Sequence, residues 1–362
     1  MSDGARQLID AIPLFSGIER AGLEGILRIF RPVSIAAATP LVRQGQSADG
    51  AYVIESGSAD VITALPGGGD ATVASLGPGS VLGEMALLES GTRSATVIAT
   101  APVKGYFVER DSFRMLLAQR EHAAFTIQNR ITLTLCRRVR EMNERIASSS
   151  VSRNVVLPLS GQSAGPEGLR RGRCSFDYRA FLPLLPVFKR FSADDLAAFI
   201  GKTELLELDR GRILFHQGDP GTAAYVVARG ALEIARAENG QRHRIGILGP
   251  GRLCGVMSLA EGHPHGMSAS ARENTVLLEI GKAAFDSLFA GRDSVAARFK
   301  DEINRELLQA LARANNHLTR LISQARIRGG RREKKKVEEL QRALGAQDVR
   351  TGDEGGGMRG EG

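Results

Sequence analysis

Two charged side chains nine positions apart, Glu84 and Arg93, stand among small residues in one short segment. That segment reads Gly-Glu-Met-Ala-Leu-Leu-Glu-Ser-Gly-Thr-Arg-Ser-Ala-Thr-Val over residues 83–97. The Arg93 guanidinium can neutralise one phosphate charge through a forked contact, and the Glu84 carboxylate can accept a hydrogen bond from a sugar hydroxyl. Gly83 admits close backbone approach, and free N–H groups in the first turn of a short helix face an anion. The segment therefore predicts a pocket for a cyclic phosphate on a ribose.

This segment resembles the phosphate-binding cassette of cyclic nucleotide-binding domains, found in bacterial catabolite activators and in the regulatory subunit of cyclic-AMP-dependent protein kinase. The resemblance implies that Glu84 binds the ribose 2′-hydroxyl and that Arg93 binds the cyclic phosphate. It also implies a backbone cradle formed by Gly83, Ser94 and Ala95. Thr92 departs from the kinase-subunit form, which usually has Pro there. Two ionic residues in fixed register make the pattern more specific than a lone glycine motif, although a helix start followed by a loop is the simpler alternative.

The same resemblance implies where the base of the ligand lies. Apolar strand positions of the first domain line that part of the pocket, namely Val61, Val73 and Ala74. The long helix that follows supplies a lid around Met142 and Asn143, and the Asn143 amide can meet a purine edge. The alternative is that the apolar residues are ordinary core and Asn143 is solvated. The Ser94 hydroxyl suits either purine, so cyclic AMP is preferred over cyclic GMP by family frequency alone.

An internal repeat organises the chain. Pro13-Leu14-Phe15 matches Pro186-Val187-Phe188 at an offset of 173 positions, and residues 76–79 match residues 248–251 at an offset of 172. The missing residue falls in the hairpin at 66–70, where a sheet tolerates a length change. Short alternating strands separated by Gly and Pro turns predict a mainly β fold with helices, in which each copy is an antiparallel barrel or jelly roll. Each copy also has a leading helix, at 18–30 or 192–200, and a long trailing helix.

These patterns predict four regions. Residues 1–146 form the domain with the intact cassette, and residues 147–179 form a linker rich in Ser, Gly, Pro and Arg. Residues 180–326 form a degenerate second copy, and residues 327–362 form a basic, then Gly-rich, disordered tail. Apolar stripes on the trailing helices favour homodimerisation or packing on their own domain, and the sequence does not choose between them.

The second copy keeps the glycine of the cassette but loses its ionic residues. Gly255 corresponds to Gly83, whereas Val256 replaces the carboxylate and His265 replaces the arginine. Loss of a charge-assisted partner costs on the order of 2 to 5 kcal/mol, so we expect no cyclic nucleotide there. A protonated His265 that restores weak binding is the alternative. Zinc at Cys254, His263 and His265 is disfavoured, because three candidates in one loop do not complete a site.

Composition narrows the functional classes. The 362 residues carry a formal charge of +8 and three scattered cysteines, which favours free thiols in a reducing cytoplasm. Neither a membrane-spanning apolar run nor a signal core is present in the sequence. Lone Ser, His and Asp residues form no nucleophile elbow or metalloprotease spacing, so we expect a protein that is not an enzyme and has no cofactor besides its ligand.

The expected function is a cytoplasmic cyclic-nucleotide receptor that regulates a separate, unknown partner protein through its trailing helix and second domain. The alternative is a catabolite-activator-like, nucleic-acid-linked regulator that uses the basic segment at 326–336, which is more often a solvated end. A purely structural role for both copies is a third hypothesis. The linker segment Arg170-Arg171-Gly172-Arg173-Cys174-Ser175 superficially resembles the inhibitory Arg-Arg motif of the kinase subunit.

Overall fold

A computed structural model describes residues 12–64, 70–148, 169–172, 178–238 and 241–328. Contacts divide the chain into two compact units. The first comprises Met1–Ile131 with Asn315–Gly362, and the second comprises Thr132–Ala314. Among the described residues, none of the helices combines the length and the apolar character that crossing a bilayer requires.

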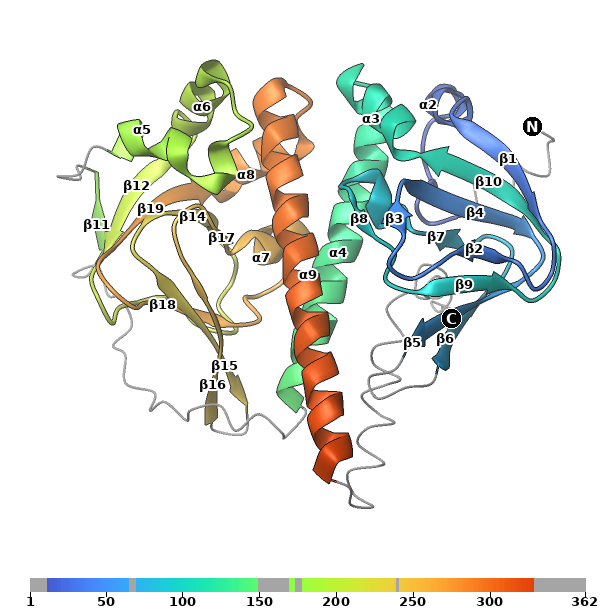
Figure 1. The fold of residues 1–362 in the computed structure, drawn as a ribbon. Coiled ribbons are helices and arrows are strands. Elements are labelled where there is room, and N and C mark those ends of the chain that lie inside the picture. The colour runs from blue at the N-terminus through green and yellow to red at the C-terminus, as the bar shows by residue number, and fades with distance from the viewer. Residues whose placement is uncertain (1–11, 65–69, 149–168, 173–177, 239–240, 329–362) are drawn as a thin grey trace, which may run out of the picture. The chain divides into compact units, whose positions relative to one another are not determined.

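The first unit consists of antiparallel strands with short helices before, between and after them (Figure 1). One four-stranded sheet has the order β1-β10-β4-β7, a second has the order β2-β9-β5-β6, and β3 pairs with β8. The strands are β1 (Phe30–Ile35), β2 (Pro40–Val42), β3 (Ser47–Ala48), β4 (Gly50–Ser56), β5 (Ala59–Ala64), β6 (Asp70–Leu76), β7 (Val81–Leu82), β8 (Gly91–Thr92), β9 (Thr96–Ala99) and β10 (Val103–Glu109). The helices are α2 (Arg20–Leu27), the 3₁₀ helix η1 (Glu84–Leu87), α3 (Arg110–Ala118) and the beginning of α4 (His122–Ser148), which continues into the second unit from Thr132.

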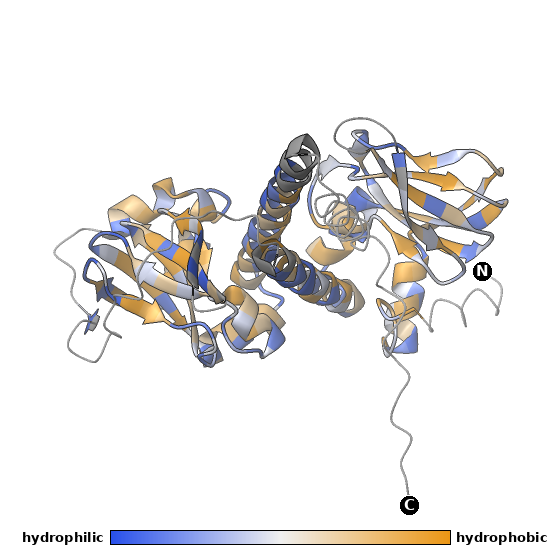
Figure 2. Ribbon diagram, turned by 90° about the horizontal axis from the view of Figure 1, so that it is seen from below, coloured by the Kyte–Doolittle hydropathy of each residue, from blue (hydrophilic) through white to orange (hydrophobic). Residues whose placement is uncertain are grey.

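Apolar side chains from both sheets meet in one core in the first unit. Ile54 on β4 and Val103 on β10 pack in the same cluster as Val61 on β5 and Val97 on β9, and each is almost fully buried. In Figure 2, hydrophobic and hydrophilic residues alternate along many of these strands, as expected where only one face of a sheet is buried. The two layers therefore hold the cassette segment, which connects β7 to β9, against a rigid support.

The second unit repeats this plan. A five-stranded sheet has the order β11-β12-β19-β14-β17, and a four-stranded sheet has the order β13-β18-β15-β16. The strands are β11 (Leu169–Arg171), β12 (Glu204–Leu208), β13 (Ile213–Phe215), β14 (Ala223–Arg229), β15 (Leu232–Glu238), β16 (Gln241–Leu248), β17 (Leu253–Cys254), β18 (Ser268–Ala271) and β19 (Thr275–Gly281). The helices are α5 (Tyr178–Phe181), η3 (Leu182–Leu184), η4 (Pro186–Phe188), α6 (Ala193–Ile200), α7 (Val256–Glu261), α8 (Lys282–Ala290) and α9 (Ser294–Arg328), of which the residues up to Ala314 belong to this unit.

The predicted fold class, a tandem repeat of antiparallel β domains with helices, is confirmed. The described residues of each copy form separate sheets that do not close into a barrel. The leading helix of the first copy is shorter than predicted, because Phe30 already begins β1. The region predicted to be a linker contains a strand, β11, that pairs with β12. The boundary between the two contact units falls inside α4, so the predicted domain limits stay a prediction. The hairpin at 66–69 and the tail at 329–362 lie outside the described residues.

The leading helix of the second copy has a capping box that can be tested. The backbone N–H of Asp195 donates to the Ser192 hydroxyl at 3.1 Å, and the Ser192 N–H donates to the Asp195 carboxylate at 3.3 Å. We expect Ser192→Ala to lower the free energy of unfolding by about 1 kcal/mol, since a helix N–H loses its acceptor. Denaturant titration measures this change. Ser287→Ala, at an exposed position within α8, is the control and should have little effect; equal effects of the two variants would contradict the prediction.

Candidate functional site

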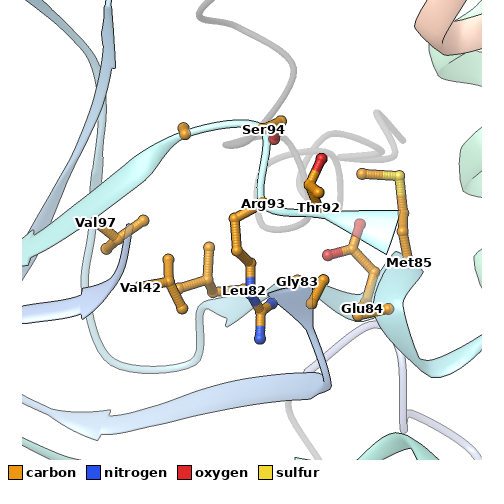
Figure 3. Close-up of a pocket in the computed structure, with 12 residues that line it drawn as sticks. Val42, Leu82, Gly83, Glu84, Met85, Thr92, Arg93, Ser94 and Val97 are labelled. Carbon is orange, nitrogen blue, oxygen red and sulfur yellow. The ribbon is translucent and has the colours of Figure 1, made fainter. Parts of the chain in front are cut away.

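A pocket in the first unit is formed where the cassette segment approaches the sheets (Figure 3). The predicted cassette residues Gly83, Glu84, Arg93, Ser94 and Ala95 all line it. The sequence analysis gave no binding role to the other residues of its wall, which are mostly apolar. These are Val42, Ala48, Leu82, Met85, Ala86, Thr92 and Val97. The pocket thus combines an apolar wall with one cation and one carboxylate, as the spacing of Glu84 and Arg93 predicts.

Gly83 sits directly before η1 with φ of 75°, in the left-handed region that favours glycine. A Cβ atom at this position would lie 2.2 Å from Nη1 of Arg93. Glycine is therefore required both by the backbone conformation and by the close approach of the guanidinium. The positive φ turns the chain so that Glu84 begins the helix. Glu84 is buried there, with only 4% of its surface exposed.

Arg93 is a buried cation, only 7% exposed. Its Nη2 donates to Oδ1 of Asp49 at 3.1 Å, whereas its buried Nη1 has no hydrogen-bond partner among the described residues. The main chain of Arg93 is fixed as well, because its N–H donates to the Gln46 carbonyl at 2.8 Å. A buried guanidinium with an unused donor is costly in a protein interior, and it is chemically suited to an anion that reaches that donor.

Asp49 is a site residue that the sequence analysis missed. Antiparallel pairing of β3 with β8 brings Ser47 opposite Thr92 and Ala48 opposite Gly91, and Asp49 directly follows β3 in the chain. Arg110 fixes this loop by donating from its guanidinium to the Ala48 carbonyl at 2.9 Å. The Asp49 side chain is 67% exposed, so it balances the Arg93 charge from the solvent side of the pair. A buried arginine needs an acidic partner, and this need was the only general signal that pointed to a residue such as Asp49.

The predicted base-contacting residues are not brought into this pocket. Val61 is fully buried in the sheet core, and it lies opposite Ala74 in the β5–β6 pair. The side chain of Val73 lies outside the described residues. Asn143 is half-buried on the part of α4 that belongs to the second compact unit. The role of these four residues toward a purine base therefore stays a prediction.

The corresponding region of the second unit is filled with side chains. Gly255 keeps a positive φ of 79° and Val256 begins α7, as the repeat predicts. The buried His265 ring stacks on Phe215, with ring centroids 3.7 Å apart and planes 10° apart. Its Nδ1 lies 2.7 Å from the Ser258 hydroxyl. By the repeat offsets, Phe215 replaces Val42 of the pocket wall, so a ring pair occupies the position that the first copy leaves to a guanidinium and a small side chain.

The electrostatics of this region also disfavour an anion. Burial lowers the pKa of His265 below its ordinary value, and the opposing effect of Asp219 is smaller. The imidazole is therefore neutral at pH 7, and the alternative of a protonated His265 requires more acidic conditions than an exposed histidine would need. Burial also raises the pKa of the Cys254 thiol to about 12. Among the described residues, no group of three or more His, Cys, Asp or Glu side chains could hold a metal ion.

Comparisons with known proteins agree with the repeat. The sequence profile of the cyclic nucleotide-binding domain matches residues 32–120 and 205–292. A cAMP-dependent protein kinase regulatory subunit of Mycosarcoma maydis is 26% identical over 270 residues, which cover 71% of this chain and 42% of that protein. Acetyltransferase Pat of Mycolicibacterium smegmatis is 36% identical over 107 residues, covering 30% of this chain and 32% of the enzyme. A CRP-like cAMP-activated global transcriptional regulator of Mycobacterium tuberculosis is 26% identical over 137 residues, covering 38% of this chain and 59% of the regulator.

The matched part of each of these relatives is well short of its full length. The kinase regulatory subunit matches across both copies of the repeat, whereas the acetyltransferase and the transcriptional regulator match over lengths near that of one copy. The likeness therefore concerns the repeated domain, and the other parts of these proteins do not enter it.

The close approach of Gly83 to Arg93 gives a direct test of the site. Gly83→Ala places a Cβ against Nη1 and strains a left-handed residue, which costs about 1 to 2 kcal/mol in backbone conformation alone. We expect a lower midpoint of denaturant unfolding for the first unit and a displaced guanidinium. Gly77→Ala is the matched control, because an added Cβ there meets no atom within 4 Å. A Gly83→Ala protein as stable as the Gly77→Ala protein would contradict this geometry.

The buried His265 predicts a pH dependence of stability. The folded state lowers the pKa of this imidazole, so the unfolded chain binds the proton more strongly. The stabilisation by neutral His265 is therefore lost as the pH falls through the ordinary pKa of a histidine. The stability difference between wild type and His265→Gln should therefore shrink between about pH 7.5 and about pH 5.5. Denaturant titration of both proteins at the two pH values measures it. A constant difference would show that His265 does not titrate in this range.

Proposed function

We propose that the first domain is a receptor for a purine cyclic nucleotide and that the second is a scaffold that does not bind one. The proposal starts from the two matches to the cyclic nucleotide-binding domain. The observation that supports this most strongly is the buried Arg93, whose Nη1 lies in the pocket without a hydrogen-bond partner among the described residues. A singly charged cyclic phosphate matches that donor, and Glu84 at the start of η1 is the acceptor for the ribose hydroxyl. Cyclic AMP is the favoured ligand, with cyclic GMP as the alternative.

The proposed output is regulation of a separate partner protein. Arg114 on α3 donates to the carbonyl of Leu88, the residue that follows η1, at 3.2 Å. Helix α3 leads into α4, a single helix that continues from the first compact unit into the second. A ligand that draws η1 inward would therefore move α3 and bias the position of α4 between two pre-existing arrangements.

Contacts inside the second unit make α4 suitable for passing on such a movement. The Thr132 hydroxyl of α4 donates to the Asn304 side chain of α9 at 2.6 Å, and both residues are buried. Arg140 of α4 pairs with the largely buried Glu261 at the end of α7. Helix α4 is thus tied to the degenerate cassette of the second domain by a charge pair and to α9 by a buried hydrogen bond.

The finer parts of this function follow as proposals. The kinase regulatory subunit that matches across both copies is named as a regulatory protein, which supports a regulatory role without catalysis for this chain. The protein then acts in the cytoplasm on an effector of unknown identity, with homodimerisation through the trailing helices as a further option. The basic segment proposed for nucleic-acid binding lies largely outside the described residues, and no described side chain favours that alternative.

Binding of nucleotides to matched variants tests the assignment of the two sites. Arg93→Ala should weaken cyclic AMP binding by about 30-fold to several-thousand-fold, since the cyclic phosphate loses its charge-assisted partner. His265→Ala is the matched variant in the second copy and should bind as wild type does. Calorimetric titration with cyclic AMP, cyclic GMP and linear AMP measures both and identifies the ligand. Unchanged affinity in Arg93→Ala would overturn the proposal.

Coupling to α4 is tested separately by amide hydrogen exchange with and without cyclic AMP. Ligand binding should change protection in residues 122–148, because η1, α3 and α4 move together. Arg140→Ala removes the Glu261 pair and should leave affinity nearly unchanged while the exchange response of α7 is lost. Binding that leaves the exchange of α4 and α7 unchanged would contradict the proposed coupling while leaving the receptor assignment intact.

A further inference from the structure

The two copies of the repeat differ at one edge of a sheet. In the first copy, β1 lies at the edge of its sheet, and no other strand among the described residues pairs with it besides β10. Pro32 in the middle of β1 lacks an N–H, which is a common protection of an exposed edge. In the second copy, the equivalent strand β12 contains no proline, and β11 from the interdomain region covers its edge (Figure 1).

Main-chain pairing holds β11 in a defined register. Leu169 lies opposite Leu208, Arg170 opposite Glu207 and Arg171 opposite Leu206. The N–H of Gly172 continues the pairing by donating to the Leu205 carbonyl at 3.2 Å. A three-residue strand of this kind is an addition to an existing sheet, in which the main chain supplies affinity and the side chains supply specificity.

The side chains around β11 are complementary in charge. Arg170 donates to the Asp209 carboxylate at 2.7 Å and lies 3.9 Å from the Glu207 carboxylate. Arg171 donates to the carboxylates of Glu204 and Glu279, each at 3.1 Å. We call these four carboxylates the acidic strip, and its members are Glu204, Glu207, Asp209 and Glu279.

The acidic strip belongs to the second copy alone. By the repeat offsets, its positions are taken in the first copy by Arg31, Ser34, Ala36 and Phe107. Glu279 is the member with the strongest need for a cation, because its side chain is only 11% exposed on the strand next to β12. Burial raises the pKa of Glu279, and the charge of Arg171 is the largest opposing influence. A cation brought by an added strand therefore stabilises a carboxylate that the sheet has already buried.

We propose that the β12 edge with its acidic strip is a strand-addition site for an extended peptide that carries two adjacent arginines. The segment Leu169–Arg171 is its resident ligand within the chain, and an arginine-containing segment of a partner protein displaces it. The contact is suited to exchange, because the arginine side chains are 67% and 58% exposed and exposed ion pairs are individually weak. Displacement frees the Arg170-Arg171 pair for an acidic surface elsewhere.

The effective concentration of the tethered segment explains why such weak contacts keep the site occupied. A segment held in the same chain competes at millimolar effective concentration for short tethers, on the order of the dissociation constant expected for a short peptide. An incoming segment therefore needs more than a single arginine, and a longer basic strand pairs with more of β12. This relation makes the site selective for partners with an extended basic segment.

The test uses the full chain and a fluorescent peptide with the sequence Gly-Leu-Arg-Arg-Gly, which is that of residues 168–172. The double variant R170E/R171E removes the resident ligand and leaves the acidic strip intact. We expect it to bind the peptide about twofold more tightly than wild type does, because competition from a tethered segment whose effective concentration is about equal to its dissociation constant is lost. The matched control is K189E/R244E, which makes the same charge change at exposed positions outside β11, β12 and β19. It should bind as wild type does.

Two further measurements keep the proposal open to contradiction. Adding E204K/E207K/D209K to R170E/R171E should abolish peptide binding, and a peptide with Glu-Glu in place of Arg-Arg should not bind. In the wild-type chain, raising the salt concentration from roughly 50 to 500 mM should speed amide exchange in residues 204–208, since the ion pairs are screened. Peptide binding that is equal in R170E/R171E and wild type, or exchange in 204–208 that is insensitive both to salt and to R170E/R171E, would overturn the proposal.

Discussion

The charge of one buried arginine constrains the first domain. Arg93 lies 93% covered against Gly83, and the only charged partner recorded for it among the described residues is the largely exposed Asp49. A desolvated guanidinium costs free energy to the extent that it lacks acceptors. The left-handed glycine, the paired short strands β3 and β8 and the clamp from Arg110 all serve to hold this cation and its partner in place. The pocket therefore contains a cation, Arg93, whose Nη1 donor has no hydrogen-bond partner among the described residues.

The second domain shows what the same backbone becomes without that cation. The left-handed glycine and the helix after it are both present there. Stacked rings of Phe215 and His265 fill the space that a guanidinium would otherwise hold open. Close packing of these rings contributes to the stability of the second domain. The second domain has an acidic sheet edge that pairs with β11 of the interdomain segment. Its helix α7 also contacts α4 through the Glu261–Arg140 ion pair.

Sequence patterns predicted the architecture well because the repeat supplied two copies of the same signal. The fold class and the trailing helices followed from glycine turns, strand alternation and helical periodicity. The five cassette residues were implied by the family resemblance, and all five line one pocket. Asp49 escaped prediction because nothing local marks an aspartate as the partner of an arginine that is forty-four positions away. The strand β11 escaped it as well, since three residues within a polar, glycine-rich region carry no periodicity and gain their structure from β12. The filling of the second site by side chains was not predicted either, because it involves Phe215 on β13, which corresponds to Val42 and lies outside the cassette segment.

The central claim is that one domain of the two binds a cyclic nucleotide. Equilibrium dialysis of the wild-type chain against labelled cyclic AMP, and in parallel against labelled cyclic GMP, counts the bound molecules directly. The account predicts saturation at one molecule per chain for at least one of these ligands. Saturation at two molecules per chain, or no binding of either nucleotide, would contradict it.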